Sequence, residues 1–318
     1  MAYNFGLSTR LSFGEESTAG TPVSTTIGAR IRSVDFQEKR QYEDVPWLVG
    51  SGSTRNANAE ILTNTDVAGT VELDACYAGG CLGLLLKHAL GSVSTTGSGP
   101  YAHAVSLAAA LPNPLTIAVE RGTSGADDVL AGCMINRLTL SCAKGETMRA
   151  RVDFIGMSAA ARTTSTPSAL TSLASTYLIK HTHAGVLAFN SVNYTLKSIE
   201  IVIDNKLARV DQLGSANSDQ PAITGHQEIT IRATLSGTSN TLQAAHRAQT
   251  SSDVSITFSD SPRSLAIVGH NATIREYADP ISGVGIVEQT VTFRCLGDDT
   301  DNGILATLTN ADSSVVAS

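Results

Sequence analysis

Apolar and polar residues alternate along most of this chain. The stretches 71–75 and 229–235 show the alternation most clearly, with Val, Leu, Ile or Ala at every second position. Because successive side chains of a β-strand point to opposite faces of a sheet, this period of two predicts strands with one buried face. The same pattern marks the segments 115–119, 138–142, 148–154, 199–203, 254–258 and 287–293. The chain is therefore predicted to be mainly β.

Two segments depart from the alternation and are predicted to be helices. Residues 81–90, CLGLLLKHAL, are short and very apolar. Residues 241–249, TLQAAHRAQ, follow a Ser-Gly-Thr-Ser-Asn cluster that is able to cap a helix. Each segment comes directly after an alternating strand.

The order of strands and helices is the same in the two halves of the chain, which predicts an internal duplication. The residues that match between the halves are Val34 with Ile199, Val71 with Ile229, Leu84 with Leu242, His88 with His246, Leu115 with Val254, Gly132 with Gly269 and Phe154 with Phe293. Residue identity is low, so chance agreement between two β-rich halves is the competing interpretation.

The duplication predicts two tandem domains, which the length of 318 residues allows. The first covers residues 1–156 and includes an N-terminal segment, and the second covers residues 179–318 and includes a C-terminal tail. Residues 157–178 between them are rich in Ala, Ser and Thr and show no clear period, which is typical of an interdomain linker.

Each half also contains a long segment between its first strand and the strand before its helix. These segments cover residues 37–66 and 205–223, and they mix apolar residues with Gly, Ser and Asn. Compact domains seldom keep such long loops without a use, and this mixture suits an arm that orders against a neighbouring subunit. The candidate arm residues are Trp47, Leu48, Val49, Leu207 and Leu213.

Composition favours a protein that assembles and disfavours one that grips DNA. Apolar residues make up 42% of the chain and charged residues only 16%, with a net charge of −7. The surface is therefore expected to carry many short neutral polar side chains, which are less costly to desolvate in an assembly than charges are. No basic patch is visible, and an acidic protein repels phosphate.

The five cysteines and the apolar segments bear on where the protein is made. Five is an odd number and no Cys-x-x-Cys occurs, so reduced and mostly buried thiols are expected, consistent with synthesis in the cytosol. The N-terminus lacks the apolar region of a signal peptide. No apolar stretch reaches ~18 residues, so no membrane span is expected.

Short patterns that resemble reactive sites are better explained as structure. Residues 122–126 nearly form a Gly-x-Ser-x-Gly elbow but lack the last Gly. His181 and His183 have no carboxylate or Cys nearby in the sequence, and the acidic residues at 298–301 lack the spacing of a calcium loop. His88 and His246, at matched helix positions, are expected to serve packing or subunit contacts. No catalytic residue, cofactor or metal site is predicted, and the protein is not expected to be an enzyme.

Several segments resemble siphophage tail tube proteins, also called major tail proteins, of the two-domain kind. The opening at 11–23, LSFGEESTAGTPV, is similar to the start of many such proteins. The strand at 69–73 followed by 82–91, and the segments 130–140, 154–156, 198–205 and 225–231, are similar to later elements of the family. The resemblance covers nearly the whole chain and consists of the general sequence pattern and the order of the strands and helices.

The resemblance implies a fold and an assembly. Each domain would be a β-sandwich with one short helix and a long hairpin arm. Sheets of neighbouring subunits would join edge to edge into a ring around a lumen, and arms would reach the next ring. Since related single-domain tubes close with six domains, three two-domain chains would make a pseudo-sixfold ring.

The same resemblance implies partners and a location. The chain would bind copies of itself, the tape measure protein and the tail terminator and tip proteins, in a virion tail assembled in the host cytoplasm. DNA would pass through the lumen during ejection without specific binding. Because the chain is acidic, we expect a negative lumen poor in Lys and Arg, with Glu72, Asp74 and Glu200 as candidate lining residues.

Two alternatives remain open at this point. Another self-assembling virion β-protein, such as a capsid decoration or sheath-associated subunit, would share most of these features. A carbohydrate-binding or carbohydrate-hydrolysing β-sandwich would usually expose aromatic side chains, and this chain has 5% aromatics and one Trp.

Overall fold

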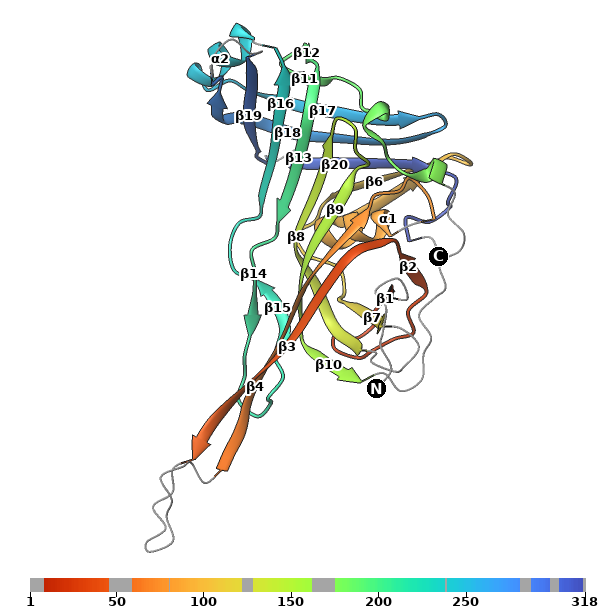
Figure 1. The fold of residues 1–318 in the computed structure, drawn as a ribbon, viewed down its shortest axis with the longest axis vertical. Coiled ribbons are helices and arrows are strands. Elements are labelled where there is room, and N and C mark those ends of the chain that lie inside the picture. Colours follow the sequence, from red (N-terminus) through yellow and green to blue (C-terminus); the bar gives the residue numbers. More distant parts are fainter. Residues whose placement is uncertain are drawn as a thin grey trace, which may run out of the picture.

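Antiparallel β-sheet dominates the molecule, as the alternating pattern predicts (Figure 1). The computed structural model describes residues 9–45, 59–79, 81–121, 128–161, 175–237, 239–280, 287–297 and 303–316. Eighteen of the described strands belong to one hydrogen-bonded sheet system, and β14 (Leu207–Val210) and β15 (Asp219–Ile223) form a separate hairpin.

The first half of the chain forms two sheets that share the long strand β8. One sheet consists, in order, of β3 (Ile31–Val45), β4 (Ala59–Asp74), β9 (Arg149–Gly156) and the later part of β8 (Asp128–Ala143). The other consists of β2 (Ile27–Ala29), β1 (Thr9–Glu15), β7 (Leu115–Arg121), the early part of β8 and β10 (Ser158–Ala161).

The second half repeats this order of strands around β18. Its first sheet consists of β13 (Leu196–Asp204), β16 (Glu228–Ser236), β19 (Glu288–Cys295) and the later part of β18 (Arg263–Ala278). Its second sheet consists of β12 (Val192–Tyr194), β11 (Leu187–Phe189), β17 (Ser251–Asp260), the early part of β18 and β20 (Ile304–Asn310). Strands β6 (Tyr101–Leu107) and β5 (Gly91–Thr96), from the first half, extend this second sheet beyond β20.

Irregularities in the ladders recur at the same places in both halves. Register shifts occur in β3 between Ile31 and Ser33, in β7 between Leu115 and Ile117, and in β8 between Ile135 and Arg137. Their counterparts lie in β13 between Leu196 and Ser198, in β17 between Ser252 and Val254, and in β18 between Ile274 and Glu276. Because a bulge fixes how two strands are aligned, these three coincidences relate the two halves residue by residue.

These registers correct several of the residue matches made from the sequence. Val34 with Ile199 and Phe154 with Phe293 agree with the ladders, but Val71 corresponds to Ala233 and Leu115 to Ser252. Seven residues separate β4 from α1 (Leu82–Leu90), whereas three separate β16 from α2 (Asn240–Arg247). When the two helices are aligned with each other, the strands before them are therefore misaligned by two pleats, so that Val71 is matched with Ile229 instead of Ala233.

Backbone conformation corrects the match of Gly132 as well. Gly132 has a φ of +68°, and a Cβ there would lie 2.4 Å from the Met157 side chain. The residue that the β18 ladder puts in the same place is Asn271, with a φ of +48°, and not Gly269. Asn is one of the few residues that tolerates this left-handed conformation. Both halves therefore have the same backbone conformation at this position, with Gly in the first and Asn in the second.

Equivalent aromatic pairs fill the space between the sheets of each half. Phe13 in β1 packs against Phe154 in β9, with ring centroids 6.1 Å apart. Phe189 in β11 packs against Phe293 in β19 at 5.0 Å. All four rings are buried, and the Leu-x-Phe of β1 is repeated by the Leu-x-Phe of β11. These pairs anchor the facing sheets of each sandwich.

Both predicted helices are present, but their environments differ. Helix α1 is apolar on every side and is buried along nearly its whole length, which is typical of a core helix. In α2, only Leu242 and Ala245 are buried, and the helix lies at one end of the molecule (Figure 1). The first half therefore has its helix inside the core, whereas the second has it on the surface.

The two halves are joined by a ladder between β8 and β13. It runs from Ser198 opposite Ala143 to Asp204 opposite Arg137, so the first sheets of both halves form one continuous surface of eight strands. Of the predicted linker, residues 158–161 form β10, because they pair with the start of β8, and residues 175–177 form a short 3-10 helix. Residues 162–174 lie outside the described residues.

Candidate assembly interface

The eight-stranded surface ends in two sheet edges. Strand β3 has a ladder with β4 alone among the described residues. Strand β18 is paired with β17 up to Thr273, and beyond it the ladders of the described residues give it only β19. Unpaired backbone groups at such an edge are a template for another strand.

Apolar side chains on these edge strands are less covered than those on the strands inside the sheet. Val34 and Phe36 on β3, and Tyr277 on β18, pack against the core but remain partly exposed. Their counterparts inside the sheet, such as Val71 and Val291, are fully buried. A further strand at either edge would cover the exposed parts.

The hairpin of β3 and β4 extends well beyond the sandwich (Figure 1). Tyr42 and Ile61 on this hairpin are each 53% exposed and Leu62 is 38% exposed. Tyr42 lies opposite Leu62 in the ladder, so these two side chains share one face of the arm, and Ile61, the neighbouring residue of β4, points to the other face. The predicted arm residues Trp47, Leu48 and Val49 lie outside the described residues.

The hairpin of β14 and β15 is the corresponding segment of the second half, and it packs against the first half. Leu207 is buried, and its backbone N–H donates to Asn136 Oδ1 at 2.9 Å. The Thr65 N–H on β4 donates to Ala216 O at 2.8 Å. Leu213, in contrast, is fully exposed. Of the two predicted arm residues in this half, Leu207 therefore contacts its own chain and Leu213 is available to a neighbour.

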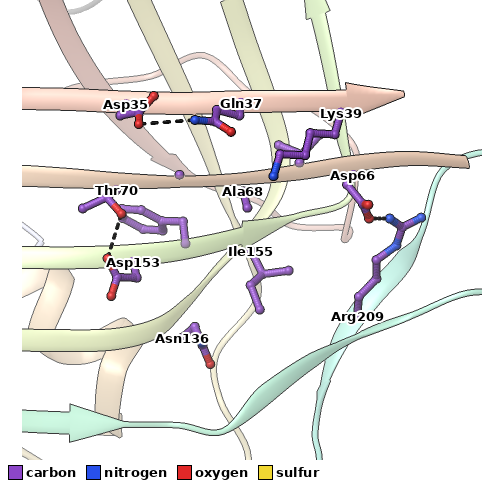
Figure 2. A pocket seen from close by; sticks show the side chains of 13 residues that line it. Asp35, Gln37, Lys39, Asp66, Ala68, Thr70, Asn136, Asp153, Ile155 and Arg209 are labelled. Carbon is purple, nitrogen blue, oxygen red and sulfur yellow. Dashed lines mark hydrogen bonds and ion pairs between the residues drawn. The ribbon is translucent and has the colours of Figure 1, made fainter. Parts of the chain in front are cut away.

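An open groove of about 520 Å³ is lined by residues of β3, β4, β8 and β9 and by Arg209 of β14 (Figure 2). Arg209 of β14 forms an ion pair with Asp66 of β4 at its border, and Arg209 also bonds Asn64. Within the groove, Thr70 Oγ1 donates to Asp153 Oδ1 at 2.8 Å. The arrangement fastens the second hairpin onto the first half through side chains far apart in the sequence.

Free sheet edges, projecting hairpins and a second half that repeats the first indicate a self-assembling β-protein. Comparison with protein families matches residues 6–295 to the phage tail tube protein family. The chain belongs to the phage tail tube protein family. It is a structural subunit of the tail of a virion, where its copies self-assemble into a tube. Comparison with curated proteins gives no match.

In this tail tube subunit, the predicted acidic residues share one face of the eight-stranded surface. Glu72, Asp74 and Glu200 alternate with buried residues of β4 and β13, so they point away from the core. Each lies opposite an arginine in the next strand. The pairs are Glu72 with Arg151, Asp74 with Arg149 and Glu200 with Arg232.

These carboxylates are accompanied by basic groups, contrary to the expectation of a face poor in Lys and Arg. Arg149 Nη1 lies 3.6 Å from Glu72 Oε1, and Arg32 Nε lies 2.8 Å from Asp74 Oδ1. The same face also carries Arg137 and Arg294. Most of these arginines therefore have a carboxylate opposite them in a neighbouring strand, which neutralises them locally, whereas Arg294 lies opposite Thr230 and Thr273.

The histidines of the tail tube subunit take part in packing. His183 Nδ1 accepts hydrogen bonds from Tyr77 Oη at 3.2 Å and from the Lys180 N–H at 3.4 Å, and burial lowers the pKa of His183. His246 stacks on Tyr277 with ring centroids 6.2 Å apart. Among the described residues, no group of three His, Cys, Asp or Glu could hold a metal ion, and no helix could span a membrane.

The sequence did not single out Arg209, Asn136 or the β8–β13 joint. Arg209 reaches Asp66, and Asn136 binds Asn205 and Leu207, across large sequence distances with no local pattern. The near-elbow sequence at 122–126, interpreted as a turn, and the acidic residues at 298–301 lie outside the described residues. The joint had one available signal, since Ile199–Ile203 is apolar at four of five positions, as expected of a strand with neighbours on both sides.

Proposed function

We propose that three copies of this chain close into a ring in which each chain supplies two equivalent tail tube domains, at residues 1–156 and 179–318. The observation that carries the proposal is the β8–β13 joint. It pairs β8, the last strand in the first sheet of the first half, with β13, the first strand in the first sheet of the second half. The free edges, β18 and β3, are the same two kinds of strand. The kind of strand pairing that joins β8 to β13 inside the chain can therefore form again between β18 of one chain and β3 of the next.

The proposed ring has a bore suited to DNA. Eight strands per chain give twenty-four strands in a closed sheet of three chains. At about 4.8 Å per strand, its circumference is at least about 115 Å, and tilting of the strands widens it further. The backbone would enclose a bore of roughly 37 Å, which is wide enough for a DNA duplex.

In this ring the face carrying Glu72, Asp74 and Glu200 lines the lumen. Free arginines along a bore would bind phosphate through counterion release, and repetition in stacked rings would multiply that affinity. Since most arginines of this face lie opposite carboxylates, DNA would find few unpaired cations. The ring is thus a conduit for DNA ejection without specific binding.

The rest of the proposal concerns assembly in a siphophage tail. The β3–β4 hairpin, with Tyr42, Ile61 and Leu62 exposed, would contact the next ring. The bore would hold the tape measure protein before ejection, and the terminator and tip proteins would bind the two ends of the tube. The buried cysteines and neutral polar surface are compatible with assembly in the host cytoplasm.

Electron microscopy of tubes formed by the purified protein tests this function. Stacked rings with threefold symmetry and six similar densities per ring are expected. The measured mass per ring should equal three chains. Sixfold symmetry with six chains per ring, or solid fibres without a bore, would contradict the proposal.

A further inference from the structure

The internal joint of the chain is a template for the contact between two copies. We infer that, in the ring proposed above and on which this inference rests, residues 35–39 of one copy pair antiparallel with residues 276–280 of a second. In this register, Lys39 lies opposite Glu276. The partner at each edge is therefore a second copy of this chain, aligned in one specific way.

The first step is the equivalence of β3 and β13. Both strands have a bulge against their partner, after Ile31 in β3 and after Leu196 in β13. Counting from the residue that resumes the ladder, Lys39 is six positions beyond Ser33, and Asp204 is six positions beyond Ser198. Lys39 thus takes the place on the free edge that Asp204 takes in the internal joint.

The second step is the equivalence of β18 and β8. The ladder of β8 with β9 resumes at Arg137 after a bulge, and that of β18 with β19 resumes at Glu276. Arg137 lies opposite Asp204 in the internal joint. Glu276 is therefore the residue that should lie opposite Lys39.

Charge complementarity supports this register. The internal pair consists of a carboxylate on β13 and a guanidinium on β8, and the inferred pair has an ammonium on β3 and a carboxylate on β18. The negative charge is thus on the β13 side in the internal pair and on the β18 side in the inferred pair, and both pairs attract. Although burial of Asp204 opposes ionisation, hydrogen bonds from Lys206 and the charges of Lys206 and Arg137 outweigh it and lower the Asp204 pKa.

Neither inferred partner is already used in an ion pair of the described part of the chain. Lys39 lies opposite Asp66 in the hairpin, but Asp66 is bound by Arg209 (Figure 2). Glu276 accepts a hydrogen bond from Thr292 Oγ1 at 3.2 Å, from a neutral partner. Both charges are thus available at the two free edges.

The core-facing positions of the inferred contact are more polar than those of the internal joint. Glu38 and Asp279 take the places of Ile203 and Leu140, by the same correspondence. Charged side chains on a free edge discourage uncontrolled strand pairing before assembly. The charged edges would thus keep single subunits from aggregating, and they would still pair with each other in the ring.

A charge-swap experiment tests the inferred pair. Lys39→Glu and Glu276→Lys each put two like charges opposite one another, so each single variant should raise the protein concentration needed for tube formation at least tenfold. The double variant Lys39→Glu/Glu276→Lys restores opposite charges and should polymerise within about threefold of the wild type. Far-ultraviolet circular dichroism should show that all three variants are folded.

Cysteine cross-linking tests the register directly. Lys39→Cys/Glu276→Cys puts two thiols at directly opposite positions, where Cβ atoms are about 5 Å apart or less. Oxidation of assembled protein should give covalent dimers and trimers. The matched control Lys39→Cys/Ala278→Cys is displaced by two residues and should cross-link far less. The five native cysteines are buried and should give little background.

The outcomes separate this inference from the proposed function. Tubes with the expected symmetry whose single charge variants assemble normally, or whose control pair cross-links better, would overturn the register but leave the ring intact. Wild-type protein that forms no tubes or rings would contradict the proposed function itself. Rescue in the double variant together with selective cross-linking would support both.

Discussion

At the scale of single residues, the strongest constraints come from buried aromatic rings and buried polar groups. Phe13 and Phe189 occupy equivalent places between the sheets and are at most 1% exposed. Glu16 is also buried, and its carboxylate accepts hydrogen bonds from Thr116 Oγ1 and from the Gly20 and Gly132 N–H groups, all at 2.8 Å. These contacts connect the opening segment to β7 and β8 of the first sandwich.

Removing either ring of this equivalent pair should destabilise the subunit strongly. Phe13→Ala or Phe189→Ala leaves a large cavity, and each should lower the free energy of unfolding by about 3–5 kcal/mol. Denaturation by urea measures this loss. Tyr42→Ala, at an exposed position, is the control and should cost less than about 0.5 kcal/mol. A Phe189→Ala variant as stable as the control would show that the second sandwich does not depend on its aromatic pair.

The group of Glu15, Lys87 and His88 predicts how stability depends on pH. His88 Nε2 lies 2.7 Å from Glu15 Oε1, and Lys87 Nζ lies 2.5 Å from the same oxygen. Burial lowers the pKa of His88 below 6.5, although Glu15 opposes the shift. The hydrogen bond from His88 lowers the pKa of Glu15 to about 2, against the effect of burial and with help from Lys87.

Both shifts mean that the folded subunit binds fewer protons than the unfolded chain in acid. Stability should therefore fall below about pH 6.5 through His88, and again between pH 4.5 and about 2 through Glu15. Melting temperatures measured from neutral to acidic pH test this. His88→Gln, which cannot be protonated, should lose less stability in the first interval than the wild type. Identical profiles would exclude His88 as the responsible group.

At the scale of elements, the sequence predicted both helices and many of the strands, but it did not predict β18 or β20 or how the strands align. Alternation marks a buried face, so β4, β8, β9, β13, β16, β17 and β19 could be found from the pattern alone. Bulges have no comparable signal, because an extra residue such as Lys197 or Asn136 does not interrupt the apolar face visibly. The correspondence was also two pleats off in the strand before each helix, because seven residues separate β4 from α1 and only three separate β16 from α2.

The β3–β4 hairpin predicts a separation between folding and assembly. Tyr42→Ser/Leu62→Ser removes two exposed apolar side chains from the arm and should change the free energy of unfolding by less than about 0.5 kcal/mol each. If the arm contacts the next ring, the variant should form rings that stack poorly. Electron microscopy and sedimentation measure the loss of long tubes. Val186→Ser, another exposed apolar position, serves as the control and should stack normally.

At the scale of the whole molecule, the eight-stranded surface combines carboxylates and arginines on one face. Glu72, Asp74 and Glu200 alternate with buried residues of their strands, and their assignment to the lumen stays a prediction. The sequence did not identify the arginines beside them, because cross-strand neighbours depend on registers between residues that are 32 to 79 positions apart. Net charge alone therefore described this face incompletely.

Removing the carboxylates should make the proposed lumen retain DNA. In Glu72→Gln/Asp74→Asn/Glu200→Gln, the arginines opposite these positions lose their nearest negative partners and become available to phosphate. Tubes of this variant should bind DNA with an affinity that falls steeply with salt, with a slope of about −0.9 per phosphate contact. Gel retardation at several salt concentrations measures the slope. Wild-type tubes are the control and should show little retardation, and equal retardation of both would contradict the assignment of this face to the lumen.

The pairing of β20 with β6 has a consequence for synthesis of the protein. Ser106 of β6 lies opposite Leu305 of β20, so the two strands are far apart along the chain. During translation, the β5–β6 hairpin must therefore wait until β20 has been made before its edge is covered. Since pairing between such distant strands slows folding, β20 determines when the sheet that contains strands of both halves becomes complete.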